Sequence, residues 1–307
     1  MDEQRSTPDE TPFNDDLDES ASAADSGATP GVGRIVLAAT PIGNVGDASA
    51  RLIELLGTSD IVAAEDTRRL HRLVTALGVE VTGRVISYHE HNEVAKTGEL
   101  LDHVRAGKTI LMVSDAGMPA VSDPGFRLVE GAVAAGLTVT AVPGPSAVLT
   151  ALALSGLPTD RFCFEGFLPR KSGDRNSRLA DLANERRTMV FFEAPHRLEV
   201  MLRALHERFG ADRRVAVCRE LTKTYEEVIR GTLRELLEWA ENNEVRGEIA
   251  VVVGGAPEQE PGKPEDHVAA VNELISQGIR LKEAVAAVAD DARVSKRELY
   301  SAVLAAR

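Results

Sequence analysis

Short apolar runs alternate with amphipathic stretches along the chain from residue 34 onward. Between the runs, apolar residues recur every three or four positions, as at 48–57, 67–78 and 126–136, which is the period of a helix with one buried face. Regular alternation of strands and helices predicts a parallel sheet covered by helices. The predicted strands of this first series are RIVLAAT (34–40), DIVAAE (60–65), RVISYH (84–89), TILMVS (109–114) and TVTAVP (138–143).

A second series of strands follows an apolar helical segment at 143–158, which is bounded by proline and glycine and is predicted to join two halves. The pattern therefore predicts an N-terminal α/β domain at 34–144 and a C-terminal α/β domain at 145–255. The predicted strands of the second domain are RFCFEGF (161–167), TMVFFEA (188–194), RVAVCRE (214–220), YEEVIRG (225–231) and EIAVVVGG (248–255).

The remaining segments differ from these domains in composition. Residues 1–33 are acidic, rich in serine, threonine and proline, and poor in large apolar groups, which predicts a disordered extension. A proline- and glutamate-rich segment at 256–264 is predicted to be a linker. A small helical domain, similar in pattern to a helix-turn-helix unit, is predicted at 265–307. Its three helical periods are 267–277, 281–290 and 296–306.

The net charge of −13 is unevenly distributed along the chain. Nine acidic residues and one arginine lie in residues 1–33, so this segment carries eight of the thirteen net negative charges. Residues 159–231 are locally basic, with 15 lysines and arginines against 12 acidic residues. An acidic protein with such a patch can still bind a polyanion.

The two cysteines, Cys163 and Cys218, lie in apolar strand-like runs and are predicted to be buried small hydrophobic residues rather than redox or metal groups. The sequence shows no signal peptide and no long apolar span, which favours a soluble cytoplasmic protein without a membrane partner. It also contains no H-E-x-x-H, C-x-x-C or serine-elbow motif, so no metal is predicted, and metal-dependent hydrolysis and acyl transfer lack support.

The segment VSDAGMPAVSDPG, at 113–125, directly follows a predicted strand. In an open parallel sheet, ligands bind beyond the carboxyl ends of the strands, so Asp115 is a candidate to contact a cation or a hydroxyl. Gly117 and Pro119 shape the backbone around it. Asp123 precedes a proline and a helix, which favours a role as the N-cap of that helix.

Two other loops follow predicted strands of the same half. AVPGPSA, at 141–147, repeats the arrangement of glycine and prolines at a strand exit, so neighbouring loops are expected to build one cleft. TPIGNVGDAS, at 40–49, follows the first predicted strand, which is the position of a phosphate-binding loop. It contains neither the G-x-G-x-x-G motif nor the G-x-x-x-x-G-K-[ST] motif. A Rossmann dinucleotide site and a P-loop are therefore disfavoured, and an ordinary strand–helix turn remains an alternative.

Charged loops follow strands in both halves. FLPRKSGDRNSR, at 167–178, is predicted to be a basic loop suited to contact phosphates, although a solvated surface is an alternative for any single residue. Its basic residues are Arg170, Lys171, Arg175 and Arg178.

Seven motifs occur in the order typical of one known family. In them the chain resembles the ribosomal RNA small subunit methyltransferase I family, a branch of the tetrapyrrole methylase superfamily, over residues 34–254 and the helical tail. The resemblance implies a two-domain α/β tetrapyrrole-methylase-like fold with a small C-terminal helical, helix-turn-helix-like domain. The motifs are ATPIGN, AAEDTRR, VSDAGMPAVSDPG, VPGPSA, GFLPRK, EAPHRL and CRELTKTYEE.

The resemblance also implies an activity: 2'-O-methylation of a cytidine in the decoding region of 16S rRNA in the small ribosomal subunit, by a homodimer that uses S-adenosylmethionine. The first loop lacks the glycine-rich string of the small-molecule methylases, which argues against a tetrapyrrole substrate. Carried over to this sequence, the residues implied to bind the methyl donor are Pro41, Ser114, Asp115, Gly117, Pro119, Ser122, Pro145, Ser146 and Ala147.

Methyl transfer to a ribose hydroxyl requires alignment of the reactants and favours a base that takes the hydroxyl proton. Glu65 and Lys223 are the preferred candidates for this role, and Asp66, Glu193 and Glu220 stay open. The residues expected to contact RNA are Arg68, Arg69, Arg170, Lys171, Arg197 and Arg219. Lys296 and Arg297, at the start of the last predicted helix, lie where a helix-turn-helix unit would meet a nucleic-acid backbone.

Two other functions are compatible with the sequence. A small-molecule or protein methylase of the same superfamily would keep the donor loops, but the basic loops and the helical tail favour RNA, because a small tetrapyrrole needs neither. A non-enzymatic nucleic-acid-binding ligand sensor would use the tail to read DNA. The number of loops that converge on one cleft favours an enzyme over a sensor.

Overall fold

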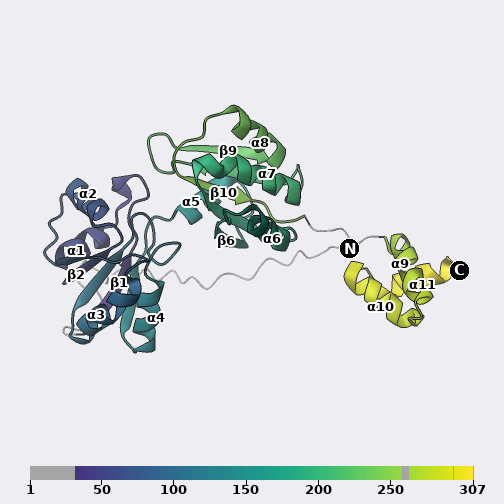
Figure 1. Ribbon diagram of the computed structural model, residues 1–307, viewed down its shortest axis with the longest axis horizontal. Helices are drawn as coiled ribbons and strands as arrows, with labels where there is room; N and C mark the ends of the chain where they lie inside the picture. The colour runs from purple at the N-terminus through teal and green to yellow at the C-terminus, as the bar shows by residue number, and fades with distance from the viewer. Residues whose placement is uncertain (1–31, 258–262, 293, 307) are drawn as a thin grey trace, which may run out of the picture. The chain divides into compact units, whose positions relative to one another are not determined.

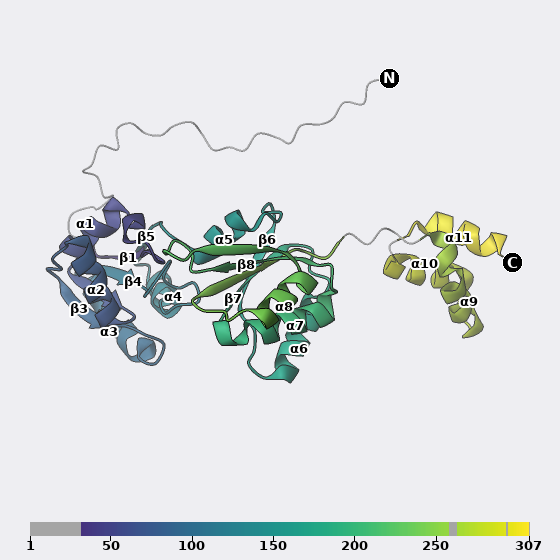
Figure 2. The same cartoon turned by 90° about the horizontal axis from the view of Figure 1, so that it is seen from above.

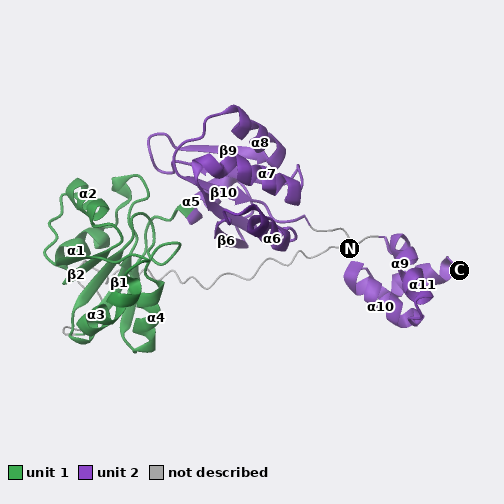
Figure 3. Cartoon of the chain, viewed as in Figure 1, with its two compact units in different colours: residues 1–147 green, residues 148–307 purple. Residues whose placement is uncertain are grey.

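The computed structural model describes residues 32–257, 263–292 and 294–306 (Figure 1). The chain divides into two compact units, residues 1–147 and 148–307 (Figure 3). The predicted acidic extension lies outside the described residues except for its last two, and so does the centre of the predicted linker.

The first unit is built on a five-stranded sheet in which every neighbouring pair is parallel, as the alternation of strands and helices predicted. Its strands are β1 (Arg34–Ala38), β2 (Ile61–Ala64), β3 (Arg84–Ser87), β4 (Thr109–Val113) and β5 (Thr138–Val142). They lie side by side in the order β3-β2-β4-β1-β5. The carboxyl ends of all five strands therefore lie at one edge of the sheet.

Both faces of this sheet are covered by helices (Figures 1 and 2). The helices are α1 (Ala50–Thr58), preceded by the short η1 (Val45–Asp47), α2 (Thr67–Leu77), α3 (Glu93–Arg105) and α4 (Phe126–Ala134). Because successive strand residues point to opposite faces, Ile35 packs with α3 and α4, whereas Val36 packs with α1 and α2. Burial on both faces explains why these strands are continuous apolar runs.

The second unit contains a mixed sheet, which the apolar pattern did not predict. Its strands are β6 (Phe162–Phe167), β7 (Thr188–Glu193), β8 (Arg214–Arg219), β9 (Glu227–Thr232) and β10 (Ile249–Val253), in the order β6-β7-β10-β8-β9. Only β6 and β7 are parallel; β10 runs antiparallel to both β7 and β8, and β9 runs antiparallel to β8. Strand direction depends on the connections, and a short loop without a helix joins β8 to β9.

One face of the second sheet is covered by α6 (Ser172–Leu182), α7 (Leu198–Phe209) and α8 (Leu233–Asn242), which enclose the core around Phe191 and Val251. The short η2 (Pro195–Arg197) leads into α7. Helix α5 (Ala147–Ser155) lies against the other face, where the Cys218 thiol donates to the Ala151 carbonyl at 3.8 Å. Both cysteines are free; Cys218 is buried, as predicted, whereas Cys163 is only partly buried.

The start of α6 corrects the prediction of a basic loop at 167–178. The chain is helical from Ser172, so Arg175 and Arg178 lie on a helix and only Arg170 and Lys171 lie in the preceding loop. The Arg175 backbone N–H donates to the Lys171 carbonyl at 3.0 Å, which closes the first turn of the helix.

The three predicted tail helices are present as α9 (Val268–Ser276), α10 (Leu281–Ala292) and α11 (Lys296–Ala305), preceded by the short η3 (Pro264–His267). They enclose a hydrophobic core of their own, which includes Val271, Val285, Leu299 and Val303. Among the described residues, none of the helices combines the length and the apolarity needed to cross a membrane.

Truncation of a central core residue should destabilise the first unit strongly. Leu111 is fully buried in β4, so Leu111→Ala is expected to lower the free energy of unfolding by about 2–5 kcal/mol. Val133→Ala on α4, where the side chain is 66% exposed, is the matched control and should change it by less than about 0.5 kcal/mol. Urea unfolding followed by circular dichroism measures both, and equal effects would contradict this core assignment.

Candidate functional site

The loops that follow β1, β4 and β5 contact one another at the carboxyl edge of the first sheet. Thr40 and Gly117 form an isolated antiparallel bridge, with N–H···O distances of 2.9 Å and 3.0 Å in the two directions. The Thr40 hydroxyl also donates to the Ser114 carbonyl at 3.2 Å, and the Ala39 N–H donates to the Val142 carbonyl at 3.1 Å. The cleft loops expected from the sequence are thus joined by backbone hydrogen bonds.

Gly117 lies where these three loops approach one another. Its φ of 81° lies in the left-handed region that favours glycine, and a Cβ there would lie 3.5 Å from Ile42 and 3.7 Å from the Pro145 carbonyl oxygen. Ala120 and Ser122 also have left-handed φ values, 67° and 62°. Left-handed backbone at non-glycine residues is costly and is concentrated at functional sites, which marks this loop as a candidate site.

A hydrogen-bonded cluster joins the ends of β2 and β4. One oxygen of the Asp115 carboxylate accepts the Asp66 backbone N–H at 3.0 Å, and the other lies 3.2 Å from Nε of Arg69. In return, the Asp115 N–H donates to the Glu65 carboxylate at 3.2 Å. A small pocket of about 50 Å³ adjoins this cluster. It is lined by Pro41, Ala64, Asp66, Arg69, Leu70, Leu73, Val113, Ser114 and Asp115.

The other predicted donor-binding residues lie in the same loops. Ser114 is buried and its hydroxyl donates to the Gly117 carbonyl at 3.1 Å. Pro119 is buried and Ser122 is exposed, while Ser146 is half-buried and immediately precedes Ala147, the first residue of α5.

Three carboxyl groups of the first unit have raised pKa values. Burial raises the pKa of Glu65, with a further contribution from the negative charge of Asp115. Burial likewise raises the pKa of Asp115, although the Arg69 guanidinium opposes this. Burial together with repulsion from Glu65 and Asp115 raises the pKa of Asp123 to about 7. Near neutral pH, Asp123 is therefore present both as a carboxylic acid and as a carboxylate.

Asp123 was predicted to be a helix N-cap, and this prediction was wrong. The N-cap of α4 is Gly125, whose φ of 133° no other residue type adopts easily, and no side chain caps this helix. The Asp123 side chain instead interacts with Ser114. The repeated Ser-Asp pair of the segment 113–125 was the sequence signal that could have assigned both aspartates to the site.

Asp66 has a structural role at the start of α2. As the N-cap of this helix, its carboxylate accepts the Arg68 backbone N–H at 2.8 Å, and the Arg68 guanidinium binds it at 3.1 Å and 2.8 Å. Hydrogen bonds from Arg68 hold the pKa of Asp66 well below its usual range. This carboxylate is consequently a weak base near neutral pH.

Lys223 and Glu220, in the second unit, form an ion-paired group. The Lys223 ammonium lies 2.8 Å from the carboxylate of Glu220 and 2.8 Å from that of Glu248. Partial burial lowers the pKa of Lys223, but the two hydrogen bonds outweigh it and raise the pKa above its ordinary value. The same lysine lowers the pKa of Glu220. A lysine that stays protonated cannot accept a proton, so these surroundings favour Glu65 over Lys223 as a base.

Glu193 ends β7 and is almost fully buried, with 3% of its surface exposed. It accepts the Ala194 N–H at 2.9 Å and lies 3.2 Å from Nε of Arg197, whose terminal nitrogen donates to the Leu168 carbonyl at 2.7 Å. Burial raises the pKa of Glu193, and its second carboxylate oxygen has no partner among the described residues. Glu193 and Arg197 together fix the start of the loop that carries Arg170.

The predicted RNA-contact residues fall into two groups. Arg170 and Lys171 are exposed and form no ion pair within the part of the chain that the structure describes. The other four bind other groups of the protein. Arg68 binds Asp66, Arg69 binds Asp115, Arg197 binds Glu193, and Arg219 binds Glu227 and the Arg246 carbonyl.

No metal centre emerges from these side chains. Within residues 32–257, 263–292 and 294–306, no three His, Cys, Asp or Glu side chains form a group that could hold a metal ion.

Comparison with known proteins leads to the same family as the fold and the motifs in the loops. Residues 34–237 match the model of the Tetrapyrrole (Corrin/Porphyrin) Methylases, the class of protein that this fold defines. Ribosomal RNA small subunit methyltransferase I of Mycobacterium tuberculosis is 51% identical over 276 residues, 90% of this chain and 96% of that protein. Its counterpart in Bacillus subtilis is 41% identical, over 88% of this chain and 94% of that protein. The chain therefore belongs to the tetrapyrrole methylase family, in the branch of ribosomal RNA small subunit methyltransferase I.

Solved structures confirm the predicted fold class. The methyltransferase CobJ has a TM-score of 0.56 at 21% identity and covers 75% of this chain and 97% of its own. Uroporphyrin-III C-methyltransferase from Thermus thermophilus, complexed with S-adenosylhomocysteine, has a TM-score of 0.52 at 20% identity and covers 72% of this chain and 96% of its own. Similarity at this level of identity defines the fold.

The raised pKa of Asp123 should make stability depend on pH. Its pKa rises from 3.8 to about 7 on folding, so the stability that the protonated group contributes is present at low pH and is lost as pH rises toward 7. The free energy of unfolding of the wild type, relative to Asp123→Asn, should therefore fall between about pH 4 and pH 7 and then level off. Unfolding at several pH values measures this, and a constant difference would contradict the assignment.

Loss of the Arg197 guanidinium should loosen the basic loop. Arg197→Gln removes a charged hydrogen bond to Leu168 and leaves Glu193 buried without its cation, which should cost about 1.5–3 kcal/mol. Hydrogen exchange in residues 168–171 should increase. The matched control is Arg203→Gln on α7, the helix that follows Arg197, where the exposed pairs with Glu199 and Glu241 are worth less than about 1 kcal/mol. Unchanged exchange in Arg197→Gln would disprove the role of this residue in holding the loop.

Proposed function

We propose that this protein methylates the 2'-hydroxyl of a cytidine ribose in the decoding region of 16S rRNA, with S-adenosylmethionine as methyl donor. The observation that carries the proposal is the 51% identity, over 90% of the chain, to relatives named ribosomal RNA small subunit methyltransferase I. The choice of the cytidine and of its 2'-oxygen rests on the resemblance of the seven motifs to that family.

The donor fits the chemistry of the loops at the carboxyl edge of the first sheet. S-adenosylmethionine, when bound, supplies a methyl group on a positively charged sulfonium sulfur. The carboxyl groups of Glu65, Asp115 and Asp123 make this edge favourable for a cationic ligand, and the adjoining pocket has apolar walls from Leu70 and Val113. The residues proposed to hold the donor are Pro41, Ser114, Asp115, Gly117, Pro119, Ser122, Pro145, Ser146 and Ala147.

Glu65 is the proposed base for the ribose hydroxyl proton. General-base catalysis is most effective when the pKa of the base approaches the working pH, and burial raises that of Glu65. Asp66 and Lys223 are less suited, because hydrogen bonds lower the pKa of the first and keep the second protonated. The hydrogen bond from the Asp115 N–H fixes the Glu65 carboxylate at the strand end. Alignment of the hydroxyl oxygen with the methyl carbon supplies the other part of the rate enhancement.

The substrate in this proposal is the small ribosomal subunit, and its recognition uses exposed cations. Arg170 and Lys171 are the predicted RNA contacts that are not neutralised by a carboxylate, and a loop of this kind suits contact with phosphates. The proposal includes a homodimer that acts in the cytoplasm, as the resemblance to the family implies.

A methyl-transfer assay tests the reaction and two of its residues. Labelled S-adenosylmethionine is incubated with small ribosomal subunits from a strain that lacks this methylation, and the labelled nucleoside is identified. Glu65→Gln should lower kcat by about 10²–10⁴-fold, because it removes the base. Asp115→Asn should weaken donor binding, measured by calorimetry, because it removes a negative charge beside the pocket.

Glu99→Gln is the control, since this half-exposed carboxylate on α3 pairs only with neighbours on the surface; it should retain full activity. Label on a base instead of a ribose would reject the 2'-O assignment. Label on a porphyrinoid precursor, with none on the subunit, would replace the rRNA substrate by a small molecule.

A further inference from the structure

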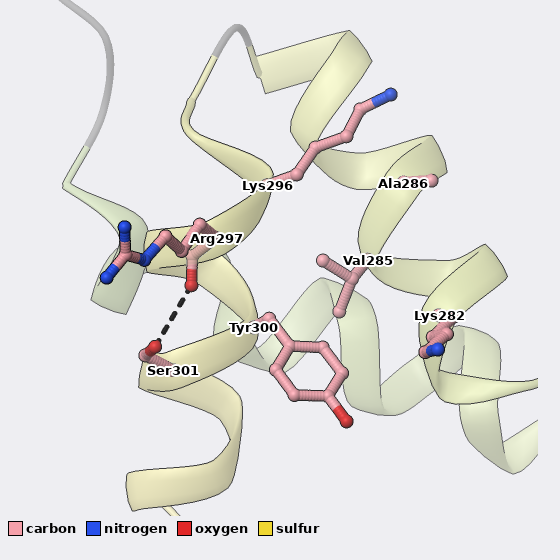
Figure 4. A pocket seen from close by; sticks show the side chains of 7 residues that line it. All are labelled: Lys282, Val285, Ala286, Lys296, Arg297, Tyr300 and Ser301. Atoms are coloured by element: carbon pink, nitrogen blue, oxygen red, sulfur yellow. Dashed lines mark hydrogen bonds between the residues drawn. The ribbon is translucent and has the colours of Figure 1, made fainter.

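The helical tail has a groove between α10 and α11 with a volume of about 430 Å³. In Figure 4, Tyr300 projects from α11 toward α10, Val285 points from α10 toward α11, and Lys296 and Lys282 lie toward opposite ends, while Arg297 extends from the other side of α11. The groove is lined by Lys282, Val285, Ala286, Lys296, Arg297, Tyr300 and Ser301.

The lining of this groove is positively charged. Three of its seven residues are lysine or arginine and none is acidic. Lys296 lies 2.9 Å from Asp290, whereas Lys282 and Arg297 are exposed and form no ion pair within the described residues. The tail as a whole is close to neutral, since residues 265–307 contain six basic and seven acidic residues. Three of the six basic residues of a unit with little net charge thus line this groove.

These cations are not needed for the packing of the unit. On α11, Leu299 and Val303 are fully buried and fill the core with Val271 and Val285, whereas Lys296 and Arg297 are exposed. A groove lined by cations that the core does not require is favourable for a polyanion.

Tyr300 adds a second kind of contact. Its ring packs partly against the core, is half-buried, and lines the groove together with Val285. An aromatic ring next to cations is the combination by which proteins bind single-stranded nucleic acid: the ring stacks on a base while the cations contact the phosphates. A duplex, whose bases are already stacked, offers no base to such a ring.

We propose that this groove binds a single-stranded segment of ribosomal RNA, with a base on Tyr300 and phosphates at Lys282 and Arg297. The inference rests on the proposed function for the identity of the RNA, and it adds a contact separate from the basic loop at Arg170 and Lys171. Two linked contacts raise the affinity for the subunit, because binding at the second contact is intramolecular once the first has formed. The chemical step is unchanged.

The direct test uses the full-length chain and a short fluorescein-labelled single-stranded RNA in an anisotropy titration. Lys282→Gln/Arg297→Gln should weaken binding roughly tenfold at 0.15 M salt and reduce the slope of log K against log salt by about 1.4, since each phosphate contact to a single strand contributes about 0.7. Tyr300→Leu, which keeps an apolar side chain against the core, should weaken binding by about tenfold with the slope unchanged.

The matched control is Arg105→Gln/Lys108→Gln, which removes two exposed cations, one at the end of α3, where it pairs with Asp102, and one directly before β4, at the edge of the first sheet away from the candidate site. It should leave binding within twofold of the wild type. Thermal unfolding of each variant establishes that the tail is still folded. With small ribosomal subunits as substrate, the groove variants should raise KM by about tenfold and leave kcat unchanged.

Wild-type affinity of both groove variants for the RNA would overturn the proposal. Weaker binding to the subunit with unchanged binding to RNA would also overturn it, because the groove would then contact a ribosomal protein. If the wild type fails to methylate the subunit, the proposed function fails, while the anisotropy titration still decides whether the groove binds RNA.

Discussion

The candidate site depends on the parallel direction of the five strands in the first sheet. Parallel strands all end at the same edge, so the loops after β1, β2, β4 and β5 are forced together although they are up to about a hundred residues apart in the sequence. The bridge between Thr40 and Gly117 and the hydrogen bond from Asp66 to Asp115 follow from this proximity. An antiparallel first sheet would place alternate loops at opposite edges.

Crowding at this edge has an electrostatic consequence. Glu65, Asp115 and Asp123 are partly removed from water near one another, with Arg69 as the cation beside Asp115, and the pKa of each carboxyl is raised. Such an arrangement favours the protonated carboxyls over the charged ones, so the charged cluster is unfavourable for folding but suited to a cationic ligand and to proton transfer. The left-handed backbone at Ala120 and Ser122 is a further cost in the same loop.

Several charged residues of the second unit are instead paired with other groups of the protein. Arg197 and Arg219 bind carboxylates and backbone carbonyls, and Lys223 joins Glu220 to Glu248. These contacts hold the loops at the ends of β7 and β8 in shape. Exposed cations lie at Arg170 and Lys171 and in the groove of the tail, so the proposed contacts with RNA use local basic positions on a protein that is acidic overall.

The sequence by itself determined the ten strands, the three tail helices, the parallel first sheet and the family, because apolar periods and motifs are local properties of the chain. Only the tertiary structure decided the antiparallel pairing of β8, β9 and β10, since the same apolar run suits either direction. It also decided the surroundings of Asp123, whose pKa depends on Glu65 and Asp115, and those of Lys223, whose partner Glu248 is 25 residues away. Burial and charge proximity depend on contacts between distant residues, and no local pattern encodes them.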